Sequence, residues 1–406
     1  MVAMNIINLY ENFNYYFSAE YKAIFERVSK VASKSKHKLY LIGGGVRDML
    51  LGIKSLDIDI TVEGDAIEFA RILEREGYAK ILNVHKDFGT VKVEIDGEKI
   101  DFASTRSEIY PKKGHLPHVK NIGCSLEEDV LRRDFTVNSL ALSLNQDNFA
   151  DLIDYVGGFD DLKDKKIRIL HDKSFIDDPT RIIRALKYAT RLGFELEENT
   201  LMLQKEYLRS VNYDMCNKRV KNEIKKTFDE PSSNAFEKFI DQGIYKLVTL
   251  KEVKKPHANI ENLFAKYNPK HPWLVYLGLI GVFENDDFCD KLELTKIEKG
   301  IILCAKGLLE KEFKDDFELY KAFCNQKIET LLILAVLGKE KQVSHYLDNF
   351  SKIKLHVTGD DLVKLGFSPS KAFADGFDYV LREKLQNSQI KKAQELKLIK
   401  YYLTNL

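Results

Sequence analysis

The stretch that decides the fold is Leu41-Ile42-Gly43-Gly44-Gly45-Val46-Arg47-Asp48, followed closely by Asp57-Ile58-Asp59. The first part leaves an apolar strand through a glycine turn and enters a helix, and such a turn offers bare backbone N–H groups to phosphate. The second part lies in another apolar strand, where positions i and i+2 share a face, so Asp57 and Asp59 point to one place. Two carboxylates on one face repel each other unless a cation lies between them, and hard oxygen ligands favour Mg²⁺. A phosphate cradle beside a carboxylate metal site predicts nucleotide chemistry.

The residues around this unit alternate between strand and helix patterns. The turn Asp96-Gly97 between two alternating apolar runs is a strong signal for a β-hairpin. Residues 5–35 predict one or two helices, and after Asp178-Pro179 the pattern is helical to the end. The fold class is therefore expected to be α+β, with a small mixed-sheet head followed by a helical remainder. The expected strands span residues 39–42, 56–62, 90–95 and 100–103, and a helix is expected over 65–76.

Composition limits the function classes that the chain can belong to. A chain of 406 residues is long enough for more than one domain. The formal net charge is +1, so any nucleic-acid surface must be a local patch. Five scattered cysteines without a Cys-x-x-Cys spacing predict neither a zinc site nor a disulfide framework. No signal peptide is visible and no apolar run reaches about 18 residues, so we expect a cytoplasmic protein without a membrane partner.

A third carboxylate, Asp101, stands between Ile100 and Phe102 in the second strand of the expected hairpin. A carboxylate flanked by apolar residues is costly to bury without a partner. Asp101 therefore needs a partner if its side chain is buried. The alternative is an ordinary solvent-facing aspartate at the edge of the sheet.

These motifs resemble those of the class II nucleotidyltransferases of the polymerase-β superfamily, which include the tRNA CCA-adding enzymes and the bacterial poly(A) polymerases. The family signature Gly-Gly-x-Val-Arg-Asp, Leu-Leu-Gly and Asp-x-Asp is matched at residues 43–48, 50–52 and 57–59. Further blocks extend the resemblance over at least residues 40–226. The resemblance implies a polymerase-β-like head followed by an all-helical neck, body and tail. We place the catalytic head at 1–165, the base-recognising neck at 166–230, the body at 231–340 and the tRNA-binding tail at 341–406.

The resemblance also implies a role for each matching polar residue. Asp57 and Asp59 would hold Mg²⁺, and Asp101 would complete a catalytic set of three carboxylates. Arginines suit phosphate because the guanidinium fork binds it through two hydrogen bonds. Without the resemblance, Arg132 and Arg133 would be assigned to pairs with nearby acidic residues such as Asp129. The implied nucleotide-binding residues are Gly43, Gly44, Arg47, Arg132, Arg133, Asp134, Asn138, Asp178 and Arg181.

Asp178 and Arg181 begin a helix, with Pro179 suited to the first helical position and Asp178 to the N-cap. Helix capping accounts for Asp178 and Pro179 but gives no role to Arg181. In the family block Glu-Asp-x-x-Arg, the Asp and Arg form Watson–Crick-like hydrogen bonds with the incoming base. The two residues here would thus select cytosine and adenine, which share an exocyclic amine. Asp177 stands where the family has Glu, and this shorter side chain leaves its supporting role open.

Three other segments match family blocks of known position. The basic segment Tyr110–Lys120 matches a flexible loop that helps to switch specificity from C to A. Gly157-Gly158 matches a hinge, although an ordinary turn explains it equally well. Arg219 and Glu223, at positions i and i+4, predict a helix-stabilising pair that braces the neck.

The sequence thus predicts a tRNA nucleotidyltransferase that adds CCA, or part of it, to the 3′ end of tRNA from CTP and ATP, with Mg²⁺ as cofactor. Its expected partners are tRNA and these two nucleotides, with no obligate protein partner evident. An A-adding-only enzyme is the first alternative, followed by a poly(A) polymerase or a CC-adding enzyme. A non-catalytic RNA-binding relative is an alternative from a different class, but such a protein needs no clustered carboxylates.

Overall fold

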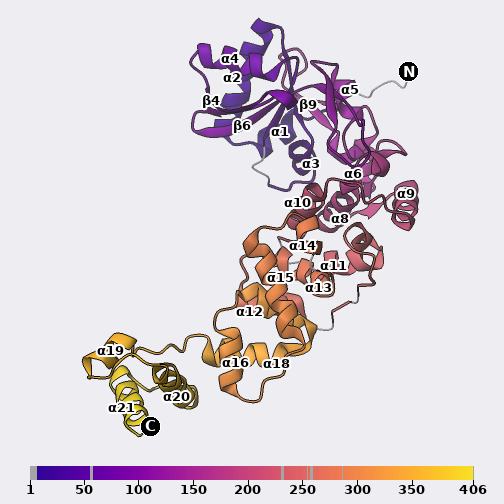
Figure 1. The fold of residues 1–406 in the computed structure, drawn as a ribbon. Helices are drawn as coiled ribbons and strands as arrows, with labels where there is room; N and C mark the ends of the chain where they lie inside the picture. The colour runs from indigo at the N-terminus through magenta and orange to yellow at the C-terminus, as the bar shows by residue number, and fades with distance from the viewer. Residues whose placement is uncertain are drawn as a thin grey trace. The chain divides into compact units, whose positions relative to one another are not determined.

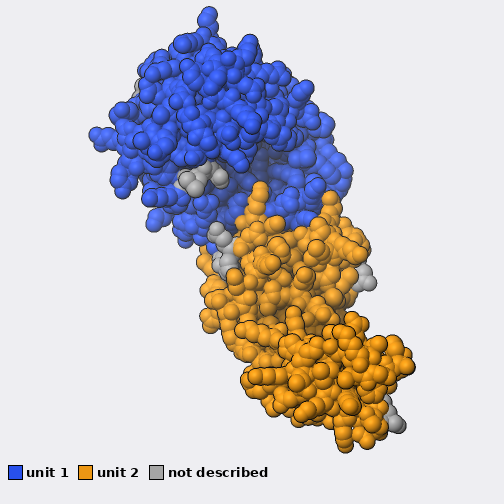
Figure 2. All heavy atoms as spheres, turned by 90° about the vertical axis from the view of Figure 1, so that its left-hand side faces the viewer, with its two compact units in different colours: residues 1–223, 241–248 blue, residues 224–240, 249–406 orange. Residues whose placement is uncertain are grey.

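The computed structural model describes residues 7–54, 58–229, 233–253, 255–256, 259–285 and 287–405. The chain divides into two compact units, which Figure 2 colours blue and orange. Unit 1 contains residues 1–223 and 241–248, and unit 2 contains residues 224–240 and 249–406. The two units are described separately below.

Unit 1 is built around an eight-stranded mixed sheet with the strand order β1-β10-β9-β2-β3-β6-β5-β4. All neighbouring strands are antiparallel except β3 and β6, which run parallel. Two-stranded sheets pair β7 with β8 and β11 with β12. The strands are β1 Ile7–Asn8, β2 Lys38–Ile42, β3 Asp59–Glu63, β4 Lys80–His85, β5 Thr90–Ile95, β6 Glu98–Ser104, β7 Arg106–Ile109, β8 His118–Ile122, β9 Ala141–Ser143, β10 Asp151–Ile153, β11 Lys166–Ile167 and β12 Glu195–Leu196.

Helices follow or separate these strands in unit 1. Helix α4 begins where the side chain of Asp65 accepts hydrogen bonds from the backbone N–H groups of Ile67 and Glu68, which is an ordinary N-cap. The helices are α1 Tyr10–Tyr16, α2 Ala19–Ser35, α3 Gly44–Leu50, α4 Ala66–Arg75, α5 Leu126–Leu131, α6 Gly158–Lys163, α7 Ser174–Asp177, α8 Thr180–Leu192 and α9 Glu198–Arg209, with short 3₁₀ turns η1 Lys86–Phe88, η2 Thr136–Asn138 and η3 Ile244–Leu247.

All regular secondary structure among the described residues of unit 2 is helical, and the orange-to-yellow part of Figure 1 shows these helices. Helix α13 is buried along its whole length, because its sequence is apolar on every side. No helix among the described residues is long and apolar enough to cross a membrane. From the unit boundary onward the helices are α10 Asn217–Phe228, α11 Ser233–Asp241, α12 Ile260–Tyr267, α13 Pro272–Gly281, α14 Asp287–Lys291, α15 Lys296–Leu309, α16 Asp316–Phe323, α17 Ile328–Leu334, α18 Glu340–His345, α19 Gly359–Lys364, α20 Ala372–Gln386 and α21 Lys392–Thr404, with π-helical segments η4 Ala335–Lys339 and η5 Tyr346–Phe350.

The predicted α+β fold class is confirmed, with every strand of the described residues in unit 1. Strand β5 has the predicted bounds, and the Asp96-Gly97 hairpin is present with positive φ at both residues. The second strand was predicted over 56–62, and its described part is β3, while residues 55–57 lie outside the described residues. The strands β1 and β4 were not predicted, and each pairs at an edge of the large sheet.

Candidate active site

The glycine turn follows β2 directly and lies against the segment that precedes β9. Gly43 has φ +77°, a conformation that favours glycine, and its N–H donates to the carbonyl of Leu140 at 3.0 Å. A Cβ added at Gly43 would lie 3.4 Å from the carbonyl oxygen of Asn138 and 3.6 Å from a terminal nitrogen of Arg133. The turn and the 133–138 segment therefore form one close-packed group, as a shared nucleotide site requires.

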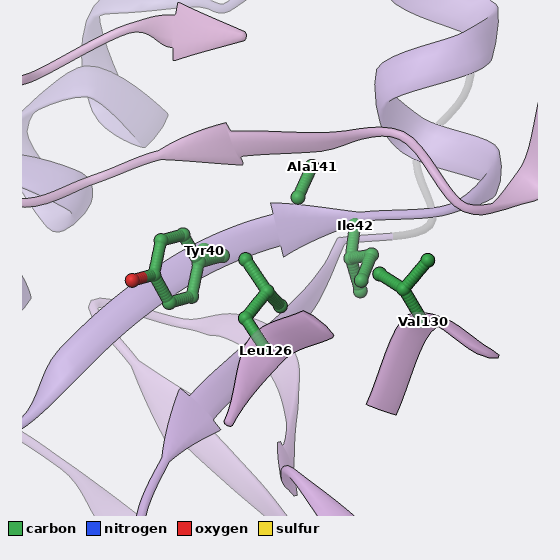
Figure 3. Packing of buried hydrophobic residues seen from close by; sticks show 5 residues of the cluster. All are labelled: Tyr40, Ile42, Leu126, Val130 and Ala141. Carbon is green, nitrogen blue, oxygen red and sulfur yellow. The ribbon is translucent and has the colours of Figure 1, made fainter. Parts of the chain in front are cut away.

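The short helix α5 places the paired arginines beside this turn. Figure 3 shows Leu126 and Val130 of α5 packed against Tyr40 and Ile42 of β2 and Ala141 of β9. All five residues are buried, so the apolar face of α5 fixes the helix on the strand that leads into the glycine turn. The chain that leaves α5 carries Arg132 and Arg133.

Arg47 and Asn138 form part of a buried network. Arg47 donates to Asn138 Oδ1 at 2.5 Å and to Asp48 Oδ1 at 2.6 Å. Asn138 donates in turn to Asp134 Oδ1 at 3.1 Å, and Arg184 of α8 lies 2.6 Å from Asp134 Oδ2. Burial alone would raise the pKa of Asp134, but the Arg184 guanidinium outweighs it and holds this pKa below its ordinary value. The network joins α3, η2 and α8 through charges that are already compensated.

Arg132 and Arg133 both bind Asp129, whose side chain is fully buried. Their terminal nitrogens lie 2.7 and 2.8 Å from its two oxygens, and Arg132 also reaches Glu108 at 3.2 Å. Burial would raise the pKa of Asp129, but the two guanidinium groups lower it below the ordinary value. The pairing alternative considered from sequence is thus present in the ligand-free chain. It is compatible with phosphate binding, since each arginine retains further N–H donors.

The carboxylates of the expected metal site meet on neighbouring strands. Asp59 begins β3 and is paired in register with Asp101 of the parallel strand β6, so both side chains leave the same face of the sheet. Asp101 is half-exposed and forms an ion pair with Lys92 of β5 at 2.9 Å. Asp57 lies outside the described residues, and within the described part of the chain no group of three or more candidate ligands is assembled. The register supports a hard-cation site built on Asp59 and Asp101, because carboxylate oxygens are the ligands such cations prefer.

Asp178 and Arg181 are both buried at the start of α8, and both are engaged by the protein. Asp178 Oδ1 accepts from the backbone N–H of Thr180 at 3.1 Å, and its Oδ2 accepts from Arg219 at 2.5 Å. Arg181 donates to Ser174 at 2.6 Å and to the carbonyl of Arg132 at 2.8 Å. The helix itself begins at Thr180, one residue later than expected, although Pro179 already has helical dihedral angles. Asp178 therefore caps the start of the helix, whereas selection of the base by Asp178 and Arg181 stays a prediction.

The Tyr110–Lys120 segment is held against residues of the neck. The N–H of Gly114 donates to the carbonyl of Asp177 at 3.0 Å, and the N–H of Cys216 donates to the carbonyl of Gly114 at 3.0 Å. Lys113 forms an ion pair with Asp177. These contacts give Asp177 a visible role: its carboxylate and its carbonyl both fix the loop.

Sequence reasoning missed Arg184, Tyr188 and Arg191, which belong to the network around Arg47. Arg184 binds Asp134, and Arg191 lies 3.3 Å from Asp48. Arg219 and Glu223 were expected to pair with each other, but the ion pairs that the structure shows are with other residues: Asp178 for Arg219, and Arg184 and Lys187 for Glu223. A signal was present, because residues 181, 184, 188 and 191 have the spacing of one helix face.

Comparison with known proteins shows what this chain is similar to. Residues 39–168 match the model of the poly A polymerase head domain. The A-adding tRNA nucleotidyltransferase of Aquifex aeolicus is 36% identical over 351 residues, which are 78% of this chain and 41% of that protein. The enzyme of the same name from Geobacter sulfurreducens is 31% identical over 413 residues, 93% of this chain and 46% of that protein. The chain is therefore similar to A-adding tRNA nucleotidyltransferases, and its residues 39–168 match a poly A polymerase head domain.

A solved structure is similar to this chain over nearly its whole length. The apo form II of a CCA-adding enzyme superposes with a TM-score of 0.84 at 26% identity and covers 99% of both chains. The chain spans less than half of the length of the two A-adding tRNA nucleotidyltransferases. The proteins in these comparisons include some named A-adding tRNA nucleotidyltransferase and some named CCA-adding enzyme.

Proposed function

We propose that this tRNA nucleotidyltransferase homologue adds CCA, or part of it, to the 3′ end of tRNA from CTP and ATP. The observation that carries the proposal is the parallel pairing of β3 with β6, which sets Asp59 beside Asp101 on one face of the sheet. The glycine turn between β2 and α3 is packed against the segment that carries Arg133 and Asn138. A nucleotidyl transfer needs both parts: carboxylates for a cation and donors for a triphosphate.

Asp59 and Asp101, together with Asp57, would hold Mg²⁺. Bound there, the cation would stabilise charge on the attacking and leaving oxygens at the α-phosphate. The 3′-hydroxyl of the RNA attacks that phosphorus, and pyrophosphate leaves. The protein's own contribution is positioning and charge stabilisation.

The nucleotide would be held by three groups of residues. The backbone of Gly43 and Gly44, with Arg47, Arg132 and Arg133, supplies donors for the phosphates. Asn138, positioned by Asp134, reads the ribose hydroxyls. Asp178 and Arg181 read the Watson–Crick edge of the base, once the present partners of their polar atoms give way to it.

A addition alone is the second candidate function. It is favoured by the names of the Aquifex and Geobacter relatives, both A-adding tRNA nucleotidyltransferases. In that case the incoming tRNA would already end in CC. The site residues and the chemistry would be the same, and only the accepted primer and nucleotide would differ.

One assay tests the proposal and separates the candidates. Purified chain is incubated with tRNAs that end at the discriminator base, at C or at CC, each with CTP, ATP or both. Extension of all three primers in the presence of both nucleotides supports full CCA addition. Extension of the CC primer alone, with ATP, supports A addition. Long A tails on every primer indicate poly(A) synthesis, and no incorporation into any primer contradicts nucleotidyl transfer.

A further inference from the structure

Three cationic side chains surround the half-buried ring of Tyr188 on α8. The guanidinium carbons of Arg47 and Arg184 lie 5.1 and 5.5 Å from the ring centroid, and the ammonium nitrogen of Lys187 lies 4.8 Å from it. Each distance is within the range of about 6 Å in which an aromatic face attracts a cation. Arg47 comes from the helix that follows the glycine turn, whereas the other two cations come from the helix of Tyr188 itself.

The ring closes a circuit of contacts around the nucleotide-binding residues. Arg47 donates to Asn138, Asn138 donates to Asp134, and Asp134 accepts from Arg184. Arg184 then donates to the Tyr188 hydroxyl at 3.2 Å and lies over its ring, and the same ring contacts Arg47. Every member of the circuit therefore has its orientation set from two sides.

An aromatic ring and a carboxylate differ in how they affect the charge of the cation that they orient. A carboxylate that orients Arg47 also neutralises its charge, as Asp48 does at 2.6 Å. A neutral ring attracts the guanidinium through its quadrupole and leaves the net charge unchanged. The ring therefore adds an orienting contact to Arg47, beyond its pair with Asp48, without placing a further negative charge where an anionic ligand would bind, and it offsets part of the mutual repulsion of the three cations.

We propose that Tyr188 is a positioning residue for nucleotide binding, and that its ring holds Arg47 in the orientation in which it meets the triphosphate. This inference rests on the proposed function. The group that does the positioning is the ring face, with the hydroxyl contributing only the contact to Arg184. The spacing of one helix face groups Tyr188 with Arg181 and Arg184, but its contact with Arg47, 141 positions earlier in the chain, is visible only in the structure.

Two substitutions at Tyr188 separate the effect of the aromatic face from the effect of side-chain volume. Tyr188→Phe keeps the aromatic face and removes the hydroxyl, whereas Tyr188→Met keeps an apolar side chain of comparable length without a face. Tyr78→Met is the matched control, because Tyr78 lies under Arg27 at 5.5 Å in a contact that involves none of the proposed nucleotide-binding residues. Each variant is assayed for the KM of the nucleotide, for kcat, for direct binding of ATP and CTP, and for melting temperature.

We expect Tyr188→Met to raise the KM and the dissociation constant of ATP and CTP at least tenfold, with tRNA affinity unchanged. Tyr188→Phe should restore both values to within threefold of the wild type, and Tyr78→Met should not change them. Equal nucleotide affinity in Tyr188→Met and the wild type would overturn the proposal, as would a Tyr188→Phe variant as impaired as Tyr188→Met. If the wild-type chain neither binds nor transfers nucleotides, it is the proposed function that has failed.

Discussion

At the scale of single residues, the carboxylates near the glycine turn fall into two kinds. Asp129, Asp134 and Asp178 are buried, and each is bound to at least one arginine, so their charges are already compensated. Asp59 is exposed and Asp101 half-exposed, on one face of the sheet. A cation needs accessible oxygens, so the exposed carboxylates are suited to metal binding and the buried ones to orienting arginines.

Replacement of Asp59 by Asn should remove the nucleotidyl transfer activity and preserve tRNA binding. The change keeps the shape of the side chain and deletes the charge that a divalent cation requires. Loss of several kcal/mol of charge stabilisation corresponds to a rate about 1,000-fold lower. Asp96→Asn, in the hairpin turn where Asp96 binds Arg27, is the control and should retain full activity. Single-turnover rates measure the effect, and a rate near that of the wild type in Asp59→Asn would sink the metal assignment.

Asp178→Ala tests whether the start of α8 reads the base. As a helix cap, Asp178 should contribute about 0.5–2 kcal/mol to stability, and its loss would lower the melting temperature without altering nucleotide choice. If Asp178 also pairs with the base, the variant should discriminate less strongly against UTP and GTP. The discrimination should decrease by about 1–3 kcal/mol. Measuring melting temperature and the four-nucleotide preference on one preparation separates these two roles. An unaltered preference would refute the reading of the base by Asp178.

The residue motifs could be predicted from sequence because each depends on local spacing. The Gly43 turn and the cap of α8 at Asp178 are set by neighbours within a few positions. The partners of those residues could not be predicted, since Arg47 and Asn138 are 91 positions apart and Asp178 and Arg219 are 41 apart. Such pairs depend on how the sheet and α8 pack, which no local pattern encodes.

At the scale of elements, the Tyr110–Lys120 loop is fixed more closely than its polar sequence suggests. Gly114 has φ +77°, and a Cβ at this position would lie 2.9 Å from the Cβ of Met215. The backbone of the loop therefore approaches the neck as closely as a glycine allows. Docking of the loop and the position of Asp177 are coupled through the hydrogen bond from the Gly114 N–H to the Asp177 carbonyl and through the ion pair between Lys113 and Asp177.

Gly114→Ala should impair A addition more than C addition, because the added methyl group forces the loop away from the neck. Gly77→Ala is a close control: Gly77 also has φ +77°, but an added Cβ there meets no atom within 4 Å. Both variants should lose about 1–2 kcal/mol of stability from the left-handed backbone conformation. Only Gly114→Ala should lower the ratio of ATP to CTP incorporation, measured with primers ending in CC and at the discriminator base. An equal ratio in both variants would reduce the loop to a structural role.

Elements with strong local signals were predicted well, and elements defined by distant pairing were not. The hairpin of β5 and β6 follows from Asp96-Gly97, and α4 follows from its cap and apolar spacing. Strand β1 consists of only Ile7 and Asn8, which become a strand by pairing with β10 almost 150 positions later. Strand β4 lies at the sheet edge with mostly exposed residues, so it lacks the apolar alternation that marks a half-buried strand.

At the scale of the whole molecule, the balanced net charge of +1 means that the proposed binding of tRNA would rely on local groups of cations. Helix α10 carries such a group, with Lys218 and Lys225 exposed. Each lysine that contacts a phosphate releases condensed counterions when RNA binds, so affinity falls as salt rises.

Lys218→Ala combined with Lys225→Ala should weaken tRNA binding and flatten its salt dependence. The slope of log K against log salt concentration should decrease in magnitude by about 2, one for each lost phosphate contact. Lys99→Ala, at an exposed position of β6, serves as the control and should leave the slope unchanged. Filter binding at several salt concentrations supplies the slopes, and equal slopes for the double variant and the wild type would exclude α10 from the RNA-binding surface.

Gly157 and Gly158 are adjacent in the sequence, but the structure requires glycine at these two positions for different reasons. The requirement at Gly158 limits which substitutions the site tolerates. Gly157 has φ +77° in open space, whereas an added Cβ at Gly158 would lie 2.2 Å from the carbonyl oxygen of Thr136. The backbone of α6 thus rests directly on the turn that presents Asn138, and Asp161 of α6 accepts a hydrogen bond from Thr136 at 2.7 Å. An added methyl group at Gly158 would collide with the Thr136 carbonyl and displace the turn that carries Asn138, the residue proposed to bind the ribose. We therefore expect a substitution at Gly158 to lower the activity, although Gly158 is neither a proposed metal ligand nor a proposed nucleotide-binding residue.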